Sequence, residues 1–211
     1  QVVRQYLEQV MQAALQNVPR LAGRVVVAID VSGSMASPVT GYRKGATSTL
    51  RCVDVASLFA CALKQVNPDI QIMPFDTQLH SLNIAENESD QASLFGRLKQ
   101  VFTGGKTGSI FEVAKQFAAL GGGGTDCSIP LNRLNRDQTP VDLMIYFSDN
   151  ESWADQLRTR HKTGMLYEWD ILKQRCPEAK LVCVDLQPYT HTQVPERTEV
   201  MNIGGFSDHV F

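Results

Sequence analysis

The amino-acid sequence predicts a single α/β domain with a doubly wound, mainly parallel central sheet, helices on both faces and one antiparallel edge strand. Strand-like and helix-like segments alternate along the chain, which is typical of parallel strands joined by helical crossovers. Residues 24–30 and 141–147 are apolar runs without polar alternation, so both are expected to be central strands covered on two faces. A length of 211 residues suits one such domain over residues 1–211.

The chain is expected to open with a helix ahead of the first strand. Residues 1–18 carry apolar side chains at three- and four-residue steps, so they predict a helix that packs on the domain and ends at Pro19. Residues 31–50 are rich in Ser, Gly and Thr and predict a loop. The next segment, 51–66, predicts a helix so apolar that other elements must cover it.

The rest of the chain continues the alternation. Residues 70–75 and 79–84 predict two strands joined by a tight turn, which would form the antiparallel edge pair. No helix is predicted between the glycine run at 121–124 and the strand that begins at residue 141. The remaining predicted elements are helices at 92–101, 109–120 and 166–176, a strand at 181–186, and a short strand or turn from residue 203.

Composition and charge exclude several classes of protein. Hydrophobic residues make up 43% and charged residues 20% of the chain, and the net charge is −2, so the chain as a whole is not a polyelectrolyte partner for nucleic acid. No window approaches the ~18 apolar residues of a membrane span, and no signal peptide is visible. We therefore expect a cytoplasmic monomer without a membrane partner. Because the chain opens at Gln1 and not at Met, it is expected to be part of a longer protein.

The five cysteines support the same compartment. They form no CxxC pair and no compact framework. Cys52, Cys61 and Cys183 stand within apolar runs, which favours reduced, buried thiols over disulfides or a zinc site.

The strongest local signal is the stretch Asp30-Val-Ser32-Gly-Ser34 at the end of the first predicted strand. A carboxylate followed by hydroxyls at alternate positions places three hard oxygen donors on one tight loop. Such oxygens suit Mg²⁺, with Mn²⁺ or Ca²⁺ as substitutes. Taken alone, the same residues could form an ordinary strand-to-helix turn.

Two further loops strengthen the metal interpretation. Ligands of doubly wound sheets lie outside the carboxyl ends of the strands, where the strand order reverses. The strand at 141–147 is the expected neighbour of the first strand across that point, and it is followed by Asp149. Thr125, after the glycine run, would complete the cluster from the loop between them.

These positions resemble the metal-ion-dependent adhesion site (MIDAS) of von Willebrand factor A (vWA) domains, which have a Rossmann-like fold. The resemblance rests on the pattern DxSxS, a distant Thr and a later Asp, and it covers the chain from about residue 24. It implies that the hydroxyls of the two serines and the threonine ligate the metal, while the acidic residues often act through water. It also implies that a carboxylate from a partner completes the coordination shell. The implied metal residues are Asp30, Ser32, Ser34, Thr125 and Asp149.

The segment around Asp149 and the stretch Asn202-Ile-Gly-Gly-Phe-Ser-Asp are similar to the Ro (TROVE) proteins. This resemblance implies a bacterial Ro-type vWA domain of a cytoplasmic ribonucleoprotein that binds noncoding Y-type RNA. The family's RNA binding belongs largely to a ring of helical repeats, which these residues do not contain. RNA binding is therefore expected through the full-length protein. A secreted adhesion-type vWA domain that binds a matrix or cell-surface protein is the alternative.

Enzymatic functions are less well supported by the motifs. Aspartyl phosphotransfer needs a second Asp two residues after the first, and Ser32 stands there. No GxSxG nucleophile elbow is present, and the segment before Gly105-Lys106-Thr107 is not that of a P-loop. We therefore expect a binding domain and not an enzyme.

Basic residues near the two metal loops form a possible ligand-binding rim. They would favour an anionic partner, either a phosphate or an acidic peptide. A solvated charged loop balanced by Asp155 and Glu168 is the simpler interpretation and is preferred. The rim residues are Arg43, Lys44, Arg51, Arg158, Arg160 and Lys162.

Overall fold

The computed structural model describes residues 10, 13–41, 49–80, 115–117, 119–149, 164–187, 194–195 and 197–205. Its sheet has five strands in the order β2-β1-β3-β4-β5, and every pairing between these strands is parallel. The strand order reverses between β1 and β3, so the predicted doubly wound sheet is confirmed. The strands are β1 (Val25–Asp30), β2 (Gln71–Phe75), β3 (Leu143–Ser148), β4 (Lys180–Asp185) and β5 (Val200–Gly204).

The predicted antiparallel edge strand lies mostly outside the described residues. After β2 the chain turns back, and Phe75 and Leu79 form an isolated antiparallel bridge. Residues 81–84, which would continue that strand, are outside the described part of the chain. The turn is therefore present as expected, while the strand itself stays a prediction.

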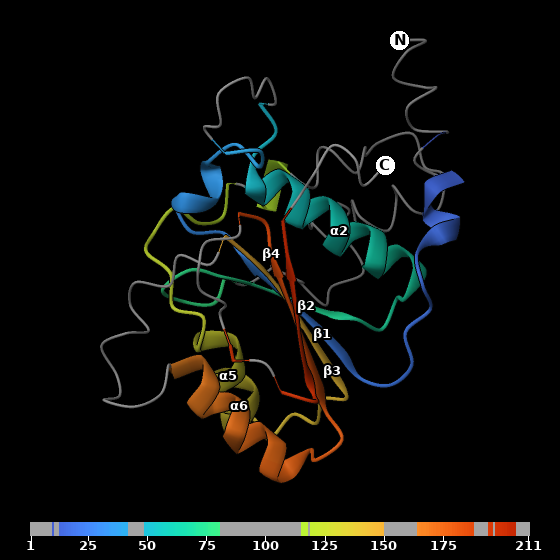
Figure 1. Cartoon of the computed structure of the whole chain (residues 1–211), viewed down its shortest axis with the longest axis vertical. Coiled ribbons are helices and arrows are strands. Elements are labelled where there is room, and N and C mark those ends of the chain that lie inside the picture. Colours follow the sequence, from blue (N-terminus) through green and yellow to red (C-terminus); the bar gives the residue numbers. More distant parts are fainter. Residues whose placement is uncertain are drawn as a thin grey trace, which may run out of the picture.

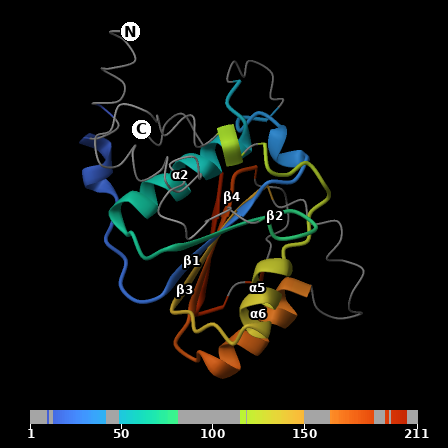
Figure 2. The ribbon, with the colours of Figure 1, turned by 180° about the vertical axis from the view of Figure 1, so that it is seen from behind.

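Helices cover both faces of the sheet. Figures 1 and 2 show α2 on one face and α5 and α6 on the other. Within the described segments, no helix is long and apolar enough to cross a membrane. The helices are α2 (Cys52–Val66), α5 (Ile129–Arg136) and α6 (Gly164–Arg175), with short 3₁₀ turns η1 (Leu15–Asn17) and η2 (Ser34–Ala36).

The helix predictions have mixed outcomes. The predicted helices at 51–66 and 166–176 are confirmed as α2 and α6. Of the helix predicted at 1–18, residues 1–9 and 11–12 lie outside the described part of the chain, so its start and its packing on the domain stay predictions. Its end is as expected, because residues 13–14 are helical, η1 stops at Asn17 and Val18 is extended ahead of Pro19. The helix predicted at 92–101 lies outside the described residues. Of the one predicted at 109–120, residues 115–117 are helical, residues 119–120 form a turn, and the others are outside the described part of the chain.

The sheet separates two apolar layers, and strand alternation explains the division. Every residue of β1 is buried, because its side chains point alternately to the two faces of the sheet and helices cover both faces. Val25, Val27 and Ile29 join the layer under α2. Val26 and Ala28 join the layer under α5 and α6. The central position of β1 thus follows from its unbroken apolar sequence.

Helix α5 departs from the sequence prediction, which has no helix in this segment. Its eight residues include Pro130 in the first turn and two asparagines, so intrinsic helix propensity is low. Tertiary packing compensates: Leu131 and Leu134 are buried against the sheet. Asn135 donates hydrogen bonds to both the carboxylate and the backbone carbonyl of Glu168 on α6, each at 2.8 Å.

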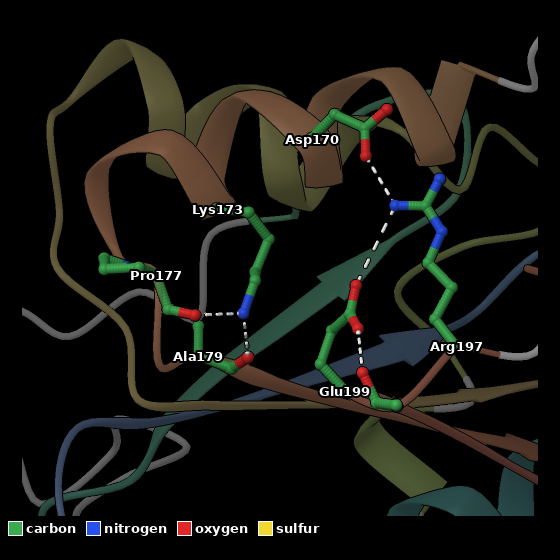
Figure 3. Close-up of polar contacts among 7 residues, drawn as sticks. Asp170, Lys173, Pro177, Ala179, Arg197 and Glu199 are labelled. Atoms are coloured by element: carbon green, nitrogen blue, oxygen red, sulfur yellow. Dashed lines mark hydrogen bonds and ion pairs between the residues drawn. The ribbon is translucent and has the colours of Figure 1, made fainter.

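Polar contacts also tie α6 to the strands beside it (Figure 3). Arg197 Nη1 lies 2.6 Å from Asp170 Oδ1 on α6 and 3.8 Å from Glu199 Oε1 ahead of β5. Lys173 Nζ donates to the carbonyl of Ala179, at 3.0 Å, in the turn that leads to β4. These contacts hold the carboxyl-terminal half of α6 against the β4–β5 edge of the sheet.

Candidate functional site

The carboxyl ends of the three neighbouring strands β2, β1 and β3 meet at one edge of the sheet. The parallel register pairs Asp30 with Phe75 on one side and Ile29 with Phe147 on the other. The residues that follow each strand therefore lie at the same level. This is the point of reversed strand order at which α/β sheets bind ligands.

Asp30 is the most deeply buried acidic group at this edge, with 0% of its surface exposed. Its Oδ1 accepts a hydrogen bond from the Ser32 amide at 2.9 Å, and its Oδ2 accepts one from Ser148 Oγ at 2.7 Å. Burial raises the pKa of Asp30 to about 6, with a further contribution from the charge of Asp149, while the hydrogen bonds from Ser32 and Ser148 lower it. A nearby cation would offset this cost of burying the charge.

The two serine hydroxyls of the first loop point toward each other. Ser32 Oγ lies 3.1 Å from Ser34 Oγ. Ser32 is buried and Ser34, the first residue of η2, is half-buried. Two neutral oxygens at this separation beside a buried carboxylate form the kind of donor set that a hard cation takes.

The glycine run brings Thr125 to the same edge. The Gly33 amide, between the two serines, donates to the Gly123 carbonyl at 2.9 Å. A Cβ at Gly121 would lie 2.0 Å from the Val31 carbonyl oxygen, so only glycine permits this close approach of the two loops. Thr125 follows within the same loop and is buried.

Asp149 completes the predicted set from the end of β3. It is 2% exposed. Its charge contributes to the raised pKa of Asp30 and, after burial, to that of Cys52, which rises to about 12. Asp149 is therefore electrostatically coupled to the end of β1 and to the start of α2.

Among the described residues, no group of three or more His, Cys, Asp or Glu side chains could hold a metal ion by itself. The cysteines are free, as expected for reduced thiols, and all but the half-buried Cys176 are buried. Any metal site at this edge must therefore draw on hydroxyl oxygens as well as the two carboxylates.

The structure describes little of the predicted basic rim. Arg51 pairs through two nitrogens with Asp54, at 2.9 and 2.8 Å, across the first turn of α2, so its charge is partly neutralised. Glu168, expected to balance the rim, is instead buried between α5 and α6, where it accepts from asparagine side chains. The other rim residues, Arg43, Lys44, Arg158, Arg160 and Lys162, lie outside the described residues.

Two residues of this edge were not among the predicted site residues. Ser148 holds the Asp30 carboxylate, and its place beside Asp149 at a strand end was a usable signal. Asp76 follows β2 directly and contacts the glycine run through its carboxylate, with Oδ2 3.3 Å from the Gly123 amide. Its contact partner is 47 residues away in the sequence, so no local motif reveals it.

Comparison with known proteins places the chain in a family. The family model described as the Ro60 vWA domain matches residues 24–211 of the chain. The chain belongs to the Ro60 vWA domain family. The resemblance inferred from the DxSxS motif and the carboxyl-terminal stretch is thereby confirmed.

Relatives of this Ro60 vWA domain are found in distant organisms. It is 24% identical over 200 residues to the RNA-binding protein RO60 of Deinococcus radiodurans, covering 95% of this chain and 32% of that protein. It is 24% identical over 210 residues to the RNA-binding protein RO60 of Caenorhabditis elegans, covering 97% of this chain and 27% of that protein. The Ro60 vWA domain described here thus spans about a third or less of the length of these relatives.

The fold is shared with a solved structure. The crystal structure of the Deinococcus radiodurans RO (RSR) protein matches with a TM-score of 0.65 and 24% sequence identity, covering 96% of this chain and 35% of that one. This match supports the Rossmann-like vWA fold independently of the family model.

Proposed function

We propose that this Ro60 vWA domain binds a divalent cation, Mg²⁺ in preference to Mn²⁺ or Ca²⁺, and uses it to hold an anionic group of a partner. The observation that carries the proposal is the pair of serine hydroxyls, 3.1 Å apart, on the loop that also bears the fully buried Asp30. The cation would be held by Ser32, Ser34 and Thr125, with Asp30 and Asp149 acting through water.

The donor set fits a hard cation on chemical grounds. All five candidates offer oxygen and none offers sulfur or imidazole nitrogen, which favours Mg²⁺ over zinc or copper. Mg²⁺ keeps several of its waters and needs few protein ligands. When bound, it would supply a positive charge at the mouth of the site. The protein's own contribution is to fix the hydroxyls and to bring the two carboxylates to the same edge, where a bound cation would offset the burial that raises the pKa of Asp30.

The partner's anionic group would be a carboxylate or a phosphate, since both are hard oxygen ligands. The relatives from Deinococcus radiodurans and Caenorhabditis elegans are named as RNA-binding proteins. We infer that the longer protein carrying this domain binds RNA of the Y type, and that the metal site takes an acidic side chain or a phosphate of that assembly. The free, buried cysteines support a reducing compartment such as the cytoplasm.

We infer binding and not catalysis at this site. Phosphotransfer from a strand-end Asp uses a second acid two residues later, and Ser32 is paired with Ser34 in that position. A secreted adhesion domain is less well supported, because the family match is to Ro60 and the cysteines are free.

Metal titration of the purified chain tests the proposal. With Mg²⁺ at about 100 times its Kd, the free energy of unfolding should rise by about 2.7 kcal/mol. Ser34→Ala and Asp149→Ala should each abolish this rise. Ser57→Ala is the matched control, because it removes another serine hydroxyl that donates within α2, at 2.6 Å to the Val53 carbonyl. It should keep the metal response. A metal-dependent rise that persists in both site variants would refute the assignment.

A further inference from the structure

Asp76 is a buried acidic residue at the edge of the sheet where the carboxyl ends of β2, β1 and β3 meet, and it belongs to none of the motifs identified in the sequence. It follows β2 directly, and 4% of its surface is exposed. The register that pairs Asp30 with Phe75 places Asp76 level with the DxSxS loop. A buried carboxylate in this position needs hydrogen-bond donors, and the structure supplies them.

The donors come from both sides of Asp76. Its Oδ1 accepts from the Gln78 amide at 3.0 Å and lies 3.0 Å from His80 Nε2. Its Oδ2 accepts from the Gly123 amide at 3.3 Å. Its backbone carbonyl accepts from the Asp126 amide at 3.1 Å. Asp76 therefore contacts the chain on both sides of Thr125, at Gly123 before it and at Asp126 after it.

Gly123 connects Asp76 to the serine loop. While its amide donates to Asp76, its carbonyl accepts from the Gly33 amide at 2.9 Å. Gly33 stands between the two serines whose hydroxyls face each other. One residue of the glycine run is thus fixed by Asp76 on one side and by the DxSxS loop on the other.

The loops approach one another closely along this chain of contacts. A Cβ at Gly123 would lie 3.0 Å from Asp76 Oδ2, which is closer than side chains tolerate without a shift. A Cβ at Gly33 would lie 3.1 Å from the Gly122 carbonyl oxygen. A movement at Asp76 would therefore be passed to the serine loop.

We propose that Asp76 is a positioning residue for the metal site: through Gly123 it sets the distance between the Thr125 loop and the loop of Ser32 and Ser34. In this proposal Asp76 is not a ligand and acts by holding the chain on both sides of Thr125, through Gly123 and Asp126. The inference rests on the proposed metal-binding function.

The first test measures Mn²⁺ affinity of the purified chain by electron paramagnetic resonance. Asp76→Ala should weaken binding by roughly 10- to 100-fold, the usual effect of losing a residue that orients metal ligands. Glu168→Ala is the control, because it also removes a buried carboxylate that accepts side-chain hydrogen bonds, here from Asn132 and Asn135 at 2.8 Å. It should lower thermal stability while leaving Mn²⁺ affinity within about twofold of wild type, since its hydrogen bonds go to α5 and not to the loops that carry the serines and Thr125.

A double-mutant cycle tests whether Asp76 acts through Gly123. In the wild-type background, Gly123→Ala should weaken Mn²⁺ binding because its Cβ meets Asp76 Oδ2 at 3.0 Å. In the Asp76→Ala background that oxygen is gone, so Gly123→Ala should cost less than it does in wild type. If Gly123→Ala weakens Mn²⁺ binding by the same factor in both backgrounds, the proposal that Asp76 acts through Gly123 is overturned.

Hydrogen exchange separates this inference from the metal proposal. Without metal, amides of 121–126 should exchange faster in Asp76→Ala than in wild type, and those of α5 should be unchanged. If Asp76→Ala does not fold, Asp76→Asn serves instead: the Gln78 and Gly123 amides donate to different oxygens of Asp76, and Asn replaces one of them with an NH2 group that cannot accept. If the wild-type chain does not bind Mn²⁺, the metal-binding proposal is wrong, while the role of Asp76 in holding residues 121–126 is still tested by hydrogen exchange. Unchanged exchange together with unchanged Mn²⁺ affinity in a folded Asp76 variant overturns the positioning role.

Discussion

The carboxylate of Asp30 is fully buried, and burial makes its ionised form costly at neutral pH. Its hydrogen bonds from Ser32 and Ser148 offset part of the cost of the buried charge. Burial nevertheless raises its pKa from 3.8 to about 6, which corresponds to a penalty on the order of 3 kcal/mol against the ionised form. Such a group gains from a cation and stays costly without one.

Asp30→Asn should therefore make the metal-free chain more stable at pH 7, by on the order of 1–3 kcal/mol, and should remove its response to Mg²⁺. The amide can still accept from Ser32 and donate to the Ser148 hydroxyl. Because a raised folded-state pKa makes stability fall as pH rises from about 4 through about 6, the variant and wild type should converge near pH 4. Thermal unfolding in EDTA measures both effects. A variant less stable than wild type at pH 7 would contradict this account.

At the scale of elements, β1 and β3 are joined at both ends by polar contacts. Near their amino-terminal ends, Asp142 accepts from the Arg24 amide at 2.7 Å and from two nitrogens of its guanidinium, at 2.9 and 2.7 Å. Gly23 adopts a φ of +84°, and a Cβ there would meet Asp142 Oδ2 at 2.7 Å. The hydrogen bond from the Arg24 side chain is the main reason that the pKa of Asp142 falls to about 2.

Asp142→Asn should lower the melting temperature at neutral pH, because it removes the charge that pairs with Arg24. A lowered folded-state pKa contributes stability above about pH 4 that is lost as pH falls toward about 2, so the gap between variant and wild type should close over that range. Thermal unfolding at several pH values measures the gap. Asp137→Asn removes an exposed ion pair between Arg133 on α5 and the residue that follows this helix, and because this pair joins no two elements its effect should be smaller. A gap that persists to about pH 2 would count against the pairing.

The elements differ in how far the sequence could predict them. β1 and β3 were predictable because unbroken β-branched and aromatic runs leave few alternatives. β5 begins at Val200, three residues before the short strand or turn expected from residue 203, so it overlaps that prediction at residues 203–204, and its burial pattern is irregular. α5 was missed because its helicity depends on Leu131, Leu134 and Asn135 finding partners on the sheet and on α6, which no local pattern reports.

At the scale of the whole molecule, the site depends on contacts between distant parts of the chain. The order of Asp30, Thr125 and Asp149 along the sequence could be matched to a motif, and the reversal of strand order between β1 and β3 was expected. The bond from Ser148 to Asp30 spans 118 residues, and that from Gly123 to Asp76 spans 47. Supporting contacts of this kind depend on the tertiary fold, so a single sequence identifies the ligands more readily than the residues that hold them.

The two apolar layers share the sheet, and this makes the described domain one cooperative unit. Val55→Ala on α2 should cost about 1–3 kcal/mol, and Leu172→Ala on α6 about 2–5 kcal/mol, because both side chains are buried. Since the sites lie on opposite faces of the sheet, their effects should add within about 0.5 kcal/mol in the double variant. Urea unfolding followed by far-UV circular dichroism and by tryptophan fluorescence should give coincident single transitions for all three variants. Two separated transitions would mean that each layer unfolds alone and that the central strands do not couple them.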